Sequence, residues 1–166
     1  LCEQCRFDFA EFNAEPANLD LLVNPPQVLQ IAIGLPAGEV RFEEGSGLSR
    51  NNLTTANATV ALLRLMSTHR EASAFGDSLP IAGVDGTLRR RLKGTVAEGN
   101  VRAKTGSLRY ANSLSGYVTT AAGERLAFSL MANRVTVQPG STVAAELDEV
   151  AVWLAGLASR SEGAGR

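Results

Sequence analysis

Two short groups of residues carry side chains that could perform acyl transfer. Ser49 and Asn51 are two positions apart in a glycine-rich stretch, and Lys104 begins the sequence Lys-Thr-Gly-Ser at residues 104–107. Acyl transfer needs a serine that loses its proton, a leaving amine that gains one, and donors that hold the substrate's carboxylate. Ser49 could relay a proton, Asn51 could fix the substrate backbone, and Lys104 could anchor charge and tune proton transfer.

Thr105 and Ser107 extend this set as substrate-binding candidates, together with Gly106 between them. Residues two apart on a strand place their side chains on one face, so both hydroxyls could reach one carboxylate. The edge of the same strand could pair with an extended peptide. Either group alone is weak, because Ser and Asn in a loop usually serve a turn, but both groups together in this order are specific.

The first group is expected in a loop that leads into a helix. Residues 44–52 read Glu-Gly-Ser-Gly-Leu-Ser-Arg-Asn-Asn, and these residue types predict a loop. The segment that follows predicts a helix that Thr54 or Thr55 caps and that runs to His69. Its core positions share helical spacing, namely Val60, Leu62, Leu63, Leu65 and Met66.

The second group is expected on a strand. Residues 101–106 alternate in character, which predicts a strand that places Lys104 on the opposite face from Val101. Two further strands, at residues 113–120 and 125–133, follow after short turns and complete an antiparallel meander. One face of the third strand carries Leu126, Phe128 and Leu130.

The last element is the clearest helix. Its apolar residues recur at spacings of four, three, four and three, namely at Val143, Leu147, Val150, Leu154 and Leu157. This stripe predicts a helix, after Pro139 and Gly140, that packs on the meander. An antiparallel sheet packed against helices makes the expected fold class α+β.

Other segments carry weaker signals. Residues 1–25 fit neither the periodicity of a helix nor that of a strand. Residues 27–33 suit a short helix, and residues 40–42 suit a short strand. Residues 76–98 predict a connecting region with one short helix, in which the three consecutive arginines at 89–91 form a solvated face.

Composition and charge exclude several classes of function. The chain has 166 residues, 45% of them hydrophobic and 20% charged, which is typical of one globular domain. No apolar run reaches the roughly 18 residues of a membrane helix. Sixteen basic and 17 acidic residues leave a net charge of -1, which predicts no nucleic-acid partner. Residues 1–44 hold eight acids and two bases, so the more basic remainder is the candidate region for an anionic ligand.

Cys2 and Cys5 could form a redox pair or half of a zinc site. A structural zinc site needs four ligands, and the single histidine, His69, is far away in a helical pattern. A redox motif would need a βαβ context, which the first 25 residues do not show. We expect an incidental pair near a terminus, no bound metal and no cofactor, and the redox compartment stays open.

Longer motifs resemble a known family. They are the loop at 44–52, Ser-Leu-Pro-Ile-Ala-Gly-Val-Asp-Gly-Thr-Leu at 78–88, Val-Arg-Ala-Lys-Thr-Gly-Ser-Leu at 101–108, and Ser-Leu-Ser-Gly-Tyr-Val at 113–118. In this order they resemble the C-terminal part of D-alanyl-D-alanine carboxypeptidase/endopeptidase penicillin-binding proteins of the low-molecular-mass class C type.

The resemblance implies an envelope serine peptidase, periplasmic or otherwise extracytoplasmic, that acts on peptidoglycan stem peptides ending in D-Ala-D-Ala. It implies an acyl-enzyme, acylation by β-lactams, and a penicillin-binding, serine β-lactamase-like transpeptidase fold. Such enzymes join three motifs in one cleft: Ser-x-x-Lys with the nucleophile, Ser-x-Asn and Lys-Thr-Gly. Ser49 and Asn51 match the second motif, and Lys104, Thr105 and Gly106 match the third.

The sequence departs from the family pattern at the nucleophile. A Ser-x-x-Lys motif is absent, because the positions three before Lys93 and Lys104 hold Arg90 and Val101. Glu44 stands where the family usually has aspartate, which is a mild change. The chain begins without a methionine or a signal peptide, so we expect a truncated or split gene product whose missing N-terminal half is a partner.

The expected organisation is an undetermined segment at residues 1–30, the C-terminal part of the penicillin-binding domain at 31–158, and a polar tail at 159–166. Alone, the chain is expected to be inactive. Two alternatives stay open. One is a non-catalytic module that holds a D-Ala peptide at Lys104 and the strand edge, and the other is a degenerate structural protein in which Ser49 and Asn51 only form a turn. The sequence does not choose between carboxypeptidase and endopeptidase activity.

Overall fold

A computed structural model of the protein describes residues 40–159. This stretch divides into a short part, residues 40–53, and a larger part, residues 54–159, which are described separately. The predictions for residues 1–39, including the helix at 27–33 and the cysteine pair, and most of the predicted tail lie outside the described residues. The elements of the larger part are α2 (Ala56–Thr68), α3 (Ala72–Ser78), the 3-10 helix η2 (Gly86–Leu88), β1 (Arg102–Leu108), β2 (Ala111–Thr119), β3 (Arg125–Asn133) and α4 (Val143–Ala155).

The sheet is the predicted meander. Its strands follow the order β1-β2-β3, and both neighbouring pairs are antiparallel. Strand β2 begins two residues earlier than predicted, so the turn between β1 and β2 consists of Arg109 and Tyr110. Gly116 lies opposite Ala103, where a Cβ atom would meet the Arg102 carbonyl and the Ala103 backbone. Only glycine allows this close approach of β1 and β2.

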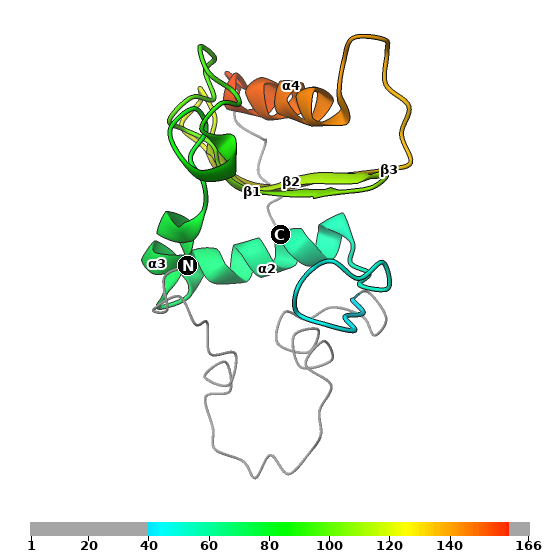
Figure 1. The fold of residues 1–166 in the computed structure, drawn as a ribbon. Coiled ribbons are helices and arrows are strands. Elements are labelled where there is room, and N and C mark those ends of the chain that lie inside the picture. Colours follow the sequence, from blue (N-terminus) through cyan, green and yellow to red (C-terminus); the bar gives the residue numbers. More distant parts are fainter. Residues whose placement is uncertain (1–39, 160–166) are drawn as a thin grey trace. The chain divides into compact units, whose positions relative to one another are not determined.

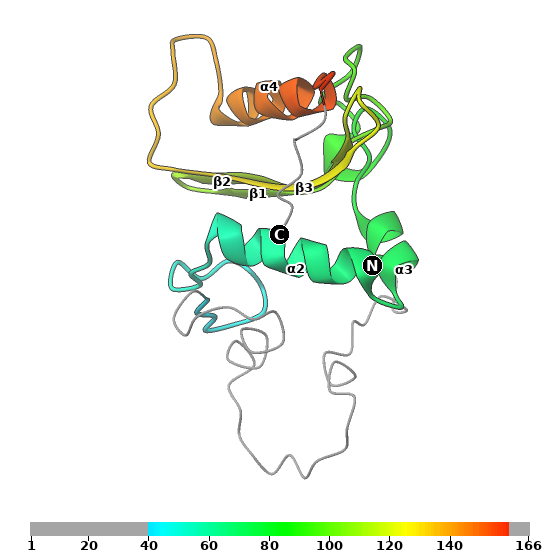
Figure 2. The same cartoon turned by 180° about the vertical axis from the view of Figure 1, so that it is seen from behind.

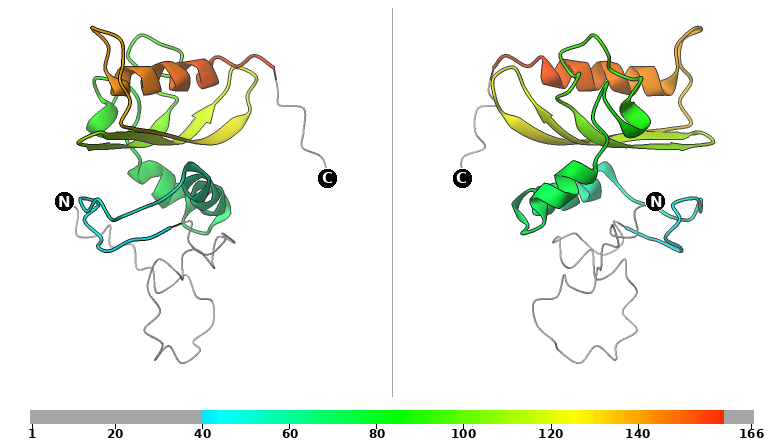
Figure 3. Two further views of the ribbon diagram at one scale, coloured as in Figure 1. Left: turned by 90° about the vertical axis from the view of Figure 1, so that its right-hand side faces the viewer. Right: turned by 60° about the vertical axis from the view of Figure 1, so that its left-hand side comes forward.

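Helices cover both faces of the sheet (Figure 1). Helix α4 lies along one face and α2 along the other, and the view from behind shows the same three layers (Figure 2). Figure 3 shows the sheet between the two helices from the side. The side chains of β1 alternate between the two faces of the sheet, as predicted. Val101 and Ala103 are fully buried in the core beneath α4, whereas Lys104 is exposed. The α+β fold class is therefore confirmed.

Helix α4 exists where it was predicted, but its buried face differs. Leu147, Ala151 and Ala155 are buried, whereas Val150 is 39% exposed. The helix ends at Ala155, before Leu157. The prediction from large apolar residues was wrong at Val150 because small alanine side chains let the helix lie close to the sheet, which rotates the stripe by about one residue.

Helix α2 begins as predicted. The Thr55 hydroxyl accepts a hydrogen bond from the Ala58 amide at 3.0 Å, and the helix ends one residue before His69. Leu63 and Met66 are its buried large residues. The buried Tyr117 hydroxyl of β2 donates to the Leu63 carbonyl at 2.6 Å, which ties α2 to the sheet.

The connecting region contains the one short helix predicted for it, the 3-10 helix η2, and a second helix, α3, overlaps its start. Helix α3, which the sequence analysis did not predict, places Phe75 edge-on against Tyr117 at 6.5 Å between ring centroids. Arg89 and Arg90 are exposed, but the solvated-face prediction was wrong for Arg91. Arg91 forms a bidentate ion pair with Asp148 of α4, at 2.7 and 3.0 Å, and so fastens the connecting region to that helix.

The short part, residues 40–53, is a loop closed at its base. Arg41 and Leu53 form a single antiparallel bridge, with N–H to O distances of 2.8 and 2.6 Å. The strand predicted for residues 40–42 is therefore reduced to one bridged residue, whereas the loop predicted for 44–52 is confirmed. Among the helices of residues 40–159, none has the length and apolar character needed to cross a membrane.

Candidate active-site segments

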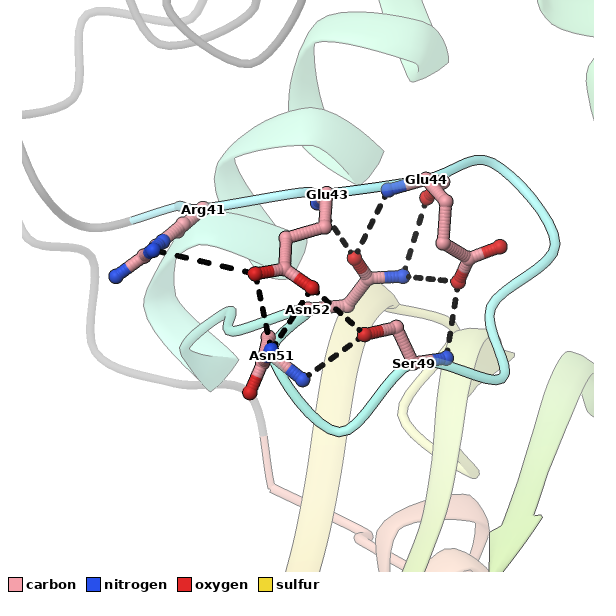
Figure 4. Close-up of polar contacts among 6 residues, drawn as sticks. All are labelled: Arg41, Glu43, Glu44, Ser49, Asn51 and Asn52. Carbon is pink, nitrogen blue, oxygen red and sulfur yellow. Dashed lines mark hydrogen bonds and ion pairs between the residues drawn. The ribbon is translucent and has the colours of Figure 1, made fainter.

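The loop that carries Ser49 is organised around the carboxylate of Glu44. The backbone amides of Ser46 and Leu48 donate to it at 2.6 and 3.2 Å. The Ser49 amide donates at 2.9 Å and the Asn52 side-chain amide at 2.8 Å (Figure 4). Hydrogen bonds from Ser46, followed by that from the Ser49 amide, lower the pKa of Glu44 to about 2. Hydrogen bonds to a charged carboxylate, rather than packing of apolar side chains, therefore fix the conformation of this loop.

A second carboxylate, Glu43, joins the two predicted site residues of the loop. The Ser49 hydroxyl donates to Glu43 Oε2 at 3.1 Å, and Asn51 Nδ2 donates to both Glu43 oxygens at 2.9 Å (Figure 4). The Asn51 amide N–H also donates to Ser49 Oγ at 3.1 Å. Arg41 lies 4.0 Å from Glu43 as an exposed counter-ion. The structure therefore brings Ser49 and Asn51 together through a residue that the sequence analysis did not select.

These bonds leave a defined set of free positions. The Ser49 hydroxyl donates its one hydrogen to Glu43 and accepts the Asn51 N–H with one of its two lone pairs, so one lone pair remains. Because the two Glu43 oxygens can share one N–H of Asn51, its second N–H and its side-chain carbonyl remain. With a carboxylate beside them, these groups present more acceptors than donors, and the loop therefore favours a positively charged donor such as an ammonium group.

The Lys-Thr-Gly-Ser sequence lies on β1, which is an edge strand of the sheet. Lys104 is exposed on the α2 face, and its ammonium donates to the Thr105 carbonyl at 2.9 Å. It lies opposite Ser115 of β2, whose hydroxyl is 2.9 Å from that of Ser129 on β3. An ammonium has three N–H donors, so two remain for a ligand.

Thr105 and Ser107 share the opposite face of β1, as their spacing predicted. The Thr105 hydroxyl donates to the Thr87 hydroxyl of the connecting region at 2.9 Å. The Ser107 hydroxyl donates to Asn112 Oδ1 at 3.3 Å. Both hydroxyls keep lone pairs, but each has already used its hydrogen within the protein. Donation to a substrate carboxylate would require these bonds to be exchanged.

The backbone of β1 has a partly open edge. The Ala103 amide donates to the Pro80 carbonyl at 2.9 Å, on the side away from β2. Amides of alternate strand residues point the same way, so those of Thr105 and Ser107 also face this side. Beyond the short pairing with residues 80–82, no other segment of the described chain pairs there with β1. The amides are therefore available to an added strand.

Gly106 has a packing reason within the sheet. It lies opposite Ser113, and a Cβ atom at residue 106 would meet the Ser113 hydroxyl oxygen. The glycine therefore leaves room for a serine on the same face as Lys104. Within residues 40–159, no cluster of three or more His, Cys, Asp or Glu side chains could hold a metal ion.

Glu43 is the residue that sequence reasoning missed. The signal was present as two consecutive acids before Gly-Ser-Gly, but only one of them could be compared with the family pattern. Glu43 is six residues from Ser49 and eight from Asn51, within a loop whose sequence has no helical or strand periodicity. The pairing depends on the loop closing at Arg41 and Leu53, which the sequence alone does not show.

Comparisons with known proteins agree on one family. The sequence profile of the D-Ala-D-Ala carboxypeptidase 3 (S13) family matches residues 23–154. The chain is 42% identical over 128 residues to a D-alanyl-D-alanine carboxypeptidase of Actinomadura sp. (strain R39), covering 74% of this chain and 23% of that protein. It is 38% identical over 97 residues to the D-alanyl-D-alanine carboxypeptidase DacB of Haemophilus influenzae, covering 57% and 20%.

A solved structure supports the same relationship. Penicillin binding protein 4 (dacB) of Haemophilus influenzae matches with a TM-score of 0.66 and 30% identity, over 80% of this chain and 31% of that one. The same protein has been solved in complex with a β-lactam, and that structure matches with a TM-score of 0.65 and 34% identity, over 78% and 31%. The chain spans less than a quarter of the length of the two relatives compared by sequence.

Proposed function

Because the chain belongs to the D-Ala-D-Ala carboxypeptidase 3 (S13) family, we propose that it supplies part of a serine-type peptidase site that removes D-alanine from peptidoglycan peptides. The observation that carries this proposal is Lys-Thr-Gly-Ser on a partly open edge strand. A stem peptide ending in D-Ala-D-Ala would add as a strand to this edge. Its backbone would bond to the outward amides of Thr105 and Ser107.

In the proposed reaction, a serine oxygen attacks the carbonyl carbon of the penultimate D-Ala. The peptide bond breaks, the terminal D-alanine leaves after its nitrogen gains a proton, and water later hydrolyses the ester. Lys104 would hold the substrate's terminal carboxylate with its two free N–H donors. Thr105 and Ser107 would help to bind that carboxylate after exchanging their present partners.

Ser49 and Asn51 would serve the same reaction from the loop. Asn51 has a free carbonyl and a free N–H, the pair of groups that a peptide amide bonds to. Ser49 could pass a proton to the leaving nitrogen only if its hydrogen left Glu43, so the Glu43 bond would set how readily that relay operates.

The nucleophile would come from outside these 166 residues, which contain no Ser-x-x-Lys sequence. We propose that the upstream half of the same gene product supplies it and is the protein's partner. In that assembly β-lactams would acylate the serine, as the penicillin-binding relatives suggest. The substrate is a cell-wall peptide, so we place the assembled enzyme in the periplasm or another extracytoplasmic compartment.

Intact-mass spectrometry after incubation with benzylpenicillin tests the proposal. The folded chain alone should stay unmodified and release no D-alanine from a D-Ala-D-Ala peptide. Fusion to the upstream segment of the Actinomadura relative should restore one adduct and D-alanine release, and Lys104→Ala in that fusion should abolish the release. An adduct on the isolated chain would contradict the missing-nucleophile argument, and a folded but unreactive fusion would contradict the proposed role.

A second candidate is a binding module without catalysis. The partly open edge of β1 and the free donors of Lys104 need no nucleophile in order to hold a D-Ala-terminated peptide. Saturable binding by the isolated chain, lost in Lys104→Ala, would favour this function if the fusion stays inactive. The absence of saturable binding would leave the degenerate structural role as the better description of the isolated chain.

A further inference from the structure

We propose that Arg109, Tyr110 and Arg134 form a cationic subsite that binds a carboxylate on an extended peptide. The three residues lie in the β1–β2 turn and immediately after β3, at the end of the sheet where the orange segment leaves β3 in Figure 1. None of the three is among the candidate site residues Ser49, Asn51, Lys104, Thr105, Gly106 and Ser107. The proposal rests on the proposed function, because the peptide is one that pairs with the edge of β1.

The charge of the sheet favours an anionic ligand. Between Glu98 and Glu146 the sequence has five basic residues and a single acid, Glu124. Within the described residues, one of the five bases, Arg102, pairs with a carboxylate, that of Asp77 at 3.3 Å, whereas Arg125 lies 4.7 Å from the Tyr117 ring. Among the described residues, the other three have no carboxylate within 4.0 Å, namely Lys104, Arg109 and Arg134. Both arginines are exposed.

The turn holds these groups in a defined arrangement. The Arg109 guanidinium lies 5.0 Å from the centre of the Tyr110 ring, which is 60% exposed. The Arg134 amide donates to the Tyr110 carbonyl at 2.7 Å, so the two segments are fastened to each other. Because stacking restricts the guanidinium, less freedom is lost when Arg109 binds an anion.

Backbone strain gives a second, independent indication. Tyr110 and Arg134 adopt positive φ angles of 68° and 53°, which residues with side chains rarely do. Glycine or asparagine would satisfy such positions at lower cost. Strained residues of this kind concentrate at binding and catalytic sites. The presence of a tyrosine and an arginine at these two positions is consistent with a functional role of their side chains.

The position of the turn suits a peptide on β1. Thr105 on β1 and Arg109 in the turn after it are four residues apart, which corresponds to about 13 Å of extended chain. A peptide whose terminal carboxylate lies near Lys104 and Thr105 would place a side chain three or four residues upstream beside the turn. Arginine binds carboxylates through paired N–H donors, so a carboxylate at that peptide position is the group that the subsite fits.

Titration of the 15N-labelled full chain tests this subsite. The probes are acetyl-Ala-Glu-Ala-D-Ala-D-Ala, its matched Gln peptide, and acetyl-Ala-Glu-Ala amide, which has the side-chain carboxylate but no D-Ala-D-Ala end. We expect the Glu pentapeptide to bind about two- to tenfold more tightly than the Gln peptide and to shift the Tyr110 and Arg134 amides. Arg109→Gln and Arg134→Gln should each reduce that preference, while Arg90→Gln, at an exposed arginine elsewhere, should leave it unchanged.

The outcomes separate the two proposals, given circular dichroism that shows each variant folded. Equal binding of the Glu and Gln peptides, with shifts at Thr105 and Ser107 only, overturns the subsite and leaves the proposed function standing. Shifts at Tyr110 and Arg134 with both acidic peptides, but none along β1 with any peptide, support the subsite and overturn peptide pairing with β1. No shift with any peptide overturns both proposals.

Discussion

The loop around Ser49 and the strand that carries Lys104 present their polar groups in different ways. In the loop, two carboxylates, Glu43 and Glu44, gather hydroxyl, amide and backbone donors within residues 43–52. On β1, Lys104 has few polar contacts of its own and is instead placed by neighbours that are fully buried, such as Ala103 and Leu114. The first arrangement is local and polar, and the second depends on the whole sheet.

The loop and β1 are therefore sensitive to different kinds of substitution. Hydrogen bonds between partly exposed groups contribute modestly, so changes in the loop should alter its geometry without unfolding the larger part. The position of Lys104 depends on side chains distant in sequence that share one core, so core changes should disturb β1 and the global stability together.

Leu114→Ala should destabilise the protein by about 2–5 kcal/mol, because Leu114 is fully buried between the sheet and α4 and its loss leaves a cavity. Urea unfolding followed by circular dichroism measures this change. Leu108→Ala is the matched control, since Leu108 is 39% exposed on the same meander, and it should cost less than about 1 kcal/mol. Equal losses for both variants would contradict the dependence of β1 on the core.

The sequence predicted the meander and the outer helices because their periodicities are strong and their burial follows from large apolar residues. It did not predict the rotation of α4, since Ala151 and Ala155 are buried by close approach to the sheet rather than by hydrophobic size. It also missed α3, whose Phe75 packs against Tyr117 of β2, a residue distant in sequence. Short elements of this kind are fixed by tertiary contacts.

The residues of the candidate site were likewise predictable only in part. Residue types and order identified Ser49, Asn51 and Lys104, because these motifs are read along the chain. Glu43 and the pairing of Arg91 with Asp148 were not predictable, since a hydrogen bond or ion pair between irregularly spaced residues leaves no repeating pattern. The polar contacts that fix the loop therefore emerge only from its three-dimensional closure.

Arg91→Ala should reduce the free energy of unfolding by about 1–3 kcal/mol. The Arg91 and Asp148 side chains are only 23% and 19% exposed, and removal of the guanidinium leaves a half-buried carboxylate without its bidentate partner. Arg90→Ala, at the exposed neighbouring position, should change stability by less than about 0.5 kcal/mol. If the two variants behaved alike in urea unfolding, Arg91 would belong to a solvated face after all.

Tyr117→Phe should cost about 0.5–1.5 kcal/mol, because the hydroxyl loses its bond to the Leu63 carbonyl while the ring stays packed. Burial raises the pKa of Tyr117, so its contribution is complete below about pH 10 and is lost as the pH rises through the raised pKa. Thermal unfolding across the alkaline range should show a steeper fall for the wild type than for Tyr117→Phe. Parallel curves would show that Tyr117 keeps no proton preferentially in the folded state.

The smallest global effect is expected at Glu44, although its local effect should be clear. Its pKa of about 2 lies below the ordinary glutamate value, so its contribution is present above about pH 4.5 and is lost as the pH falls through 2. The Leu48 and Ser49 amides, which donate to this carboxylate, should titrate with the low pKa when followed by 15N-resolved NMR. Glu44→Gln should remove that titration and leave the urea midpoint unchanged. Titration of these amides near pH 4.5 would instead mean that the carboxylate does not organise the loop in solution, and the contrast between a polar loop and a core-supported strand would fail at the loop.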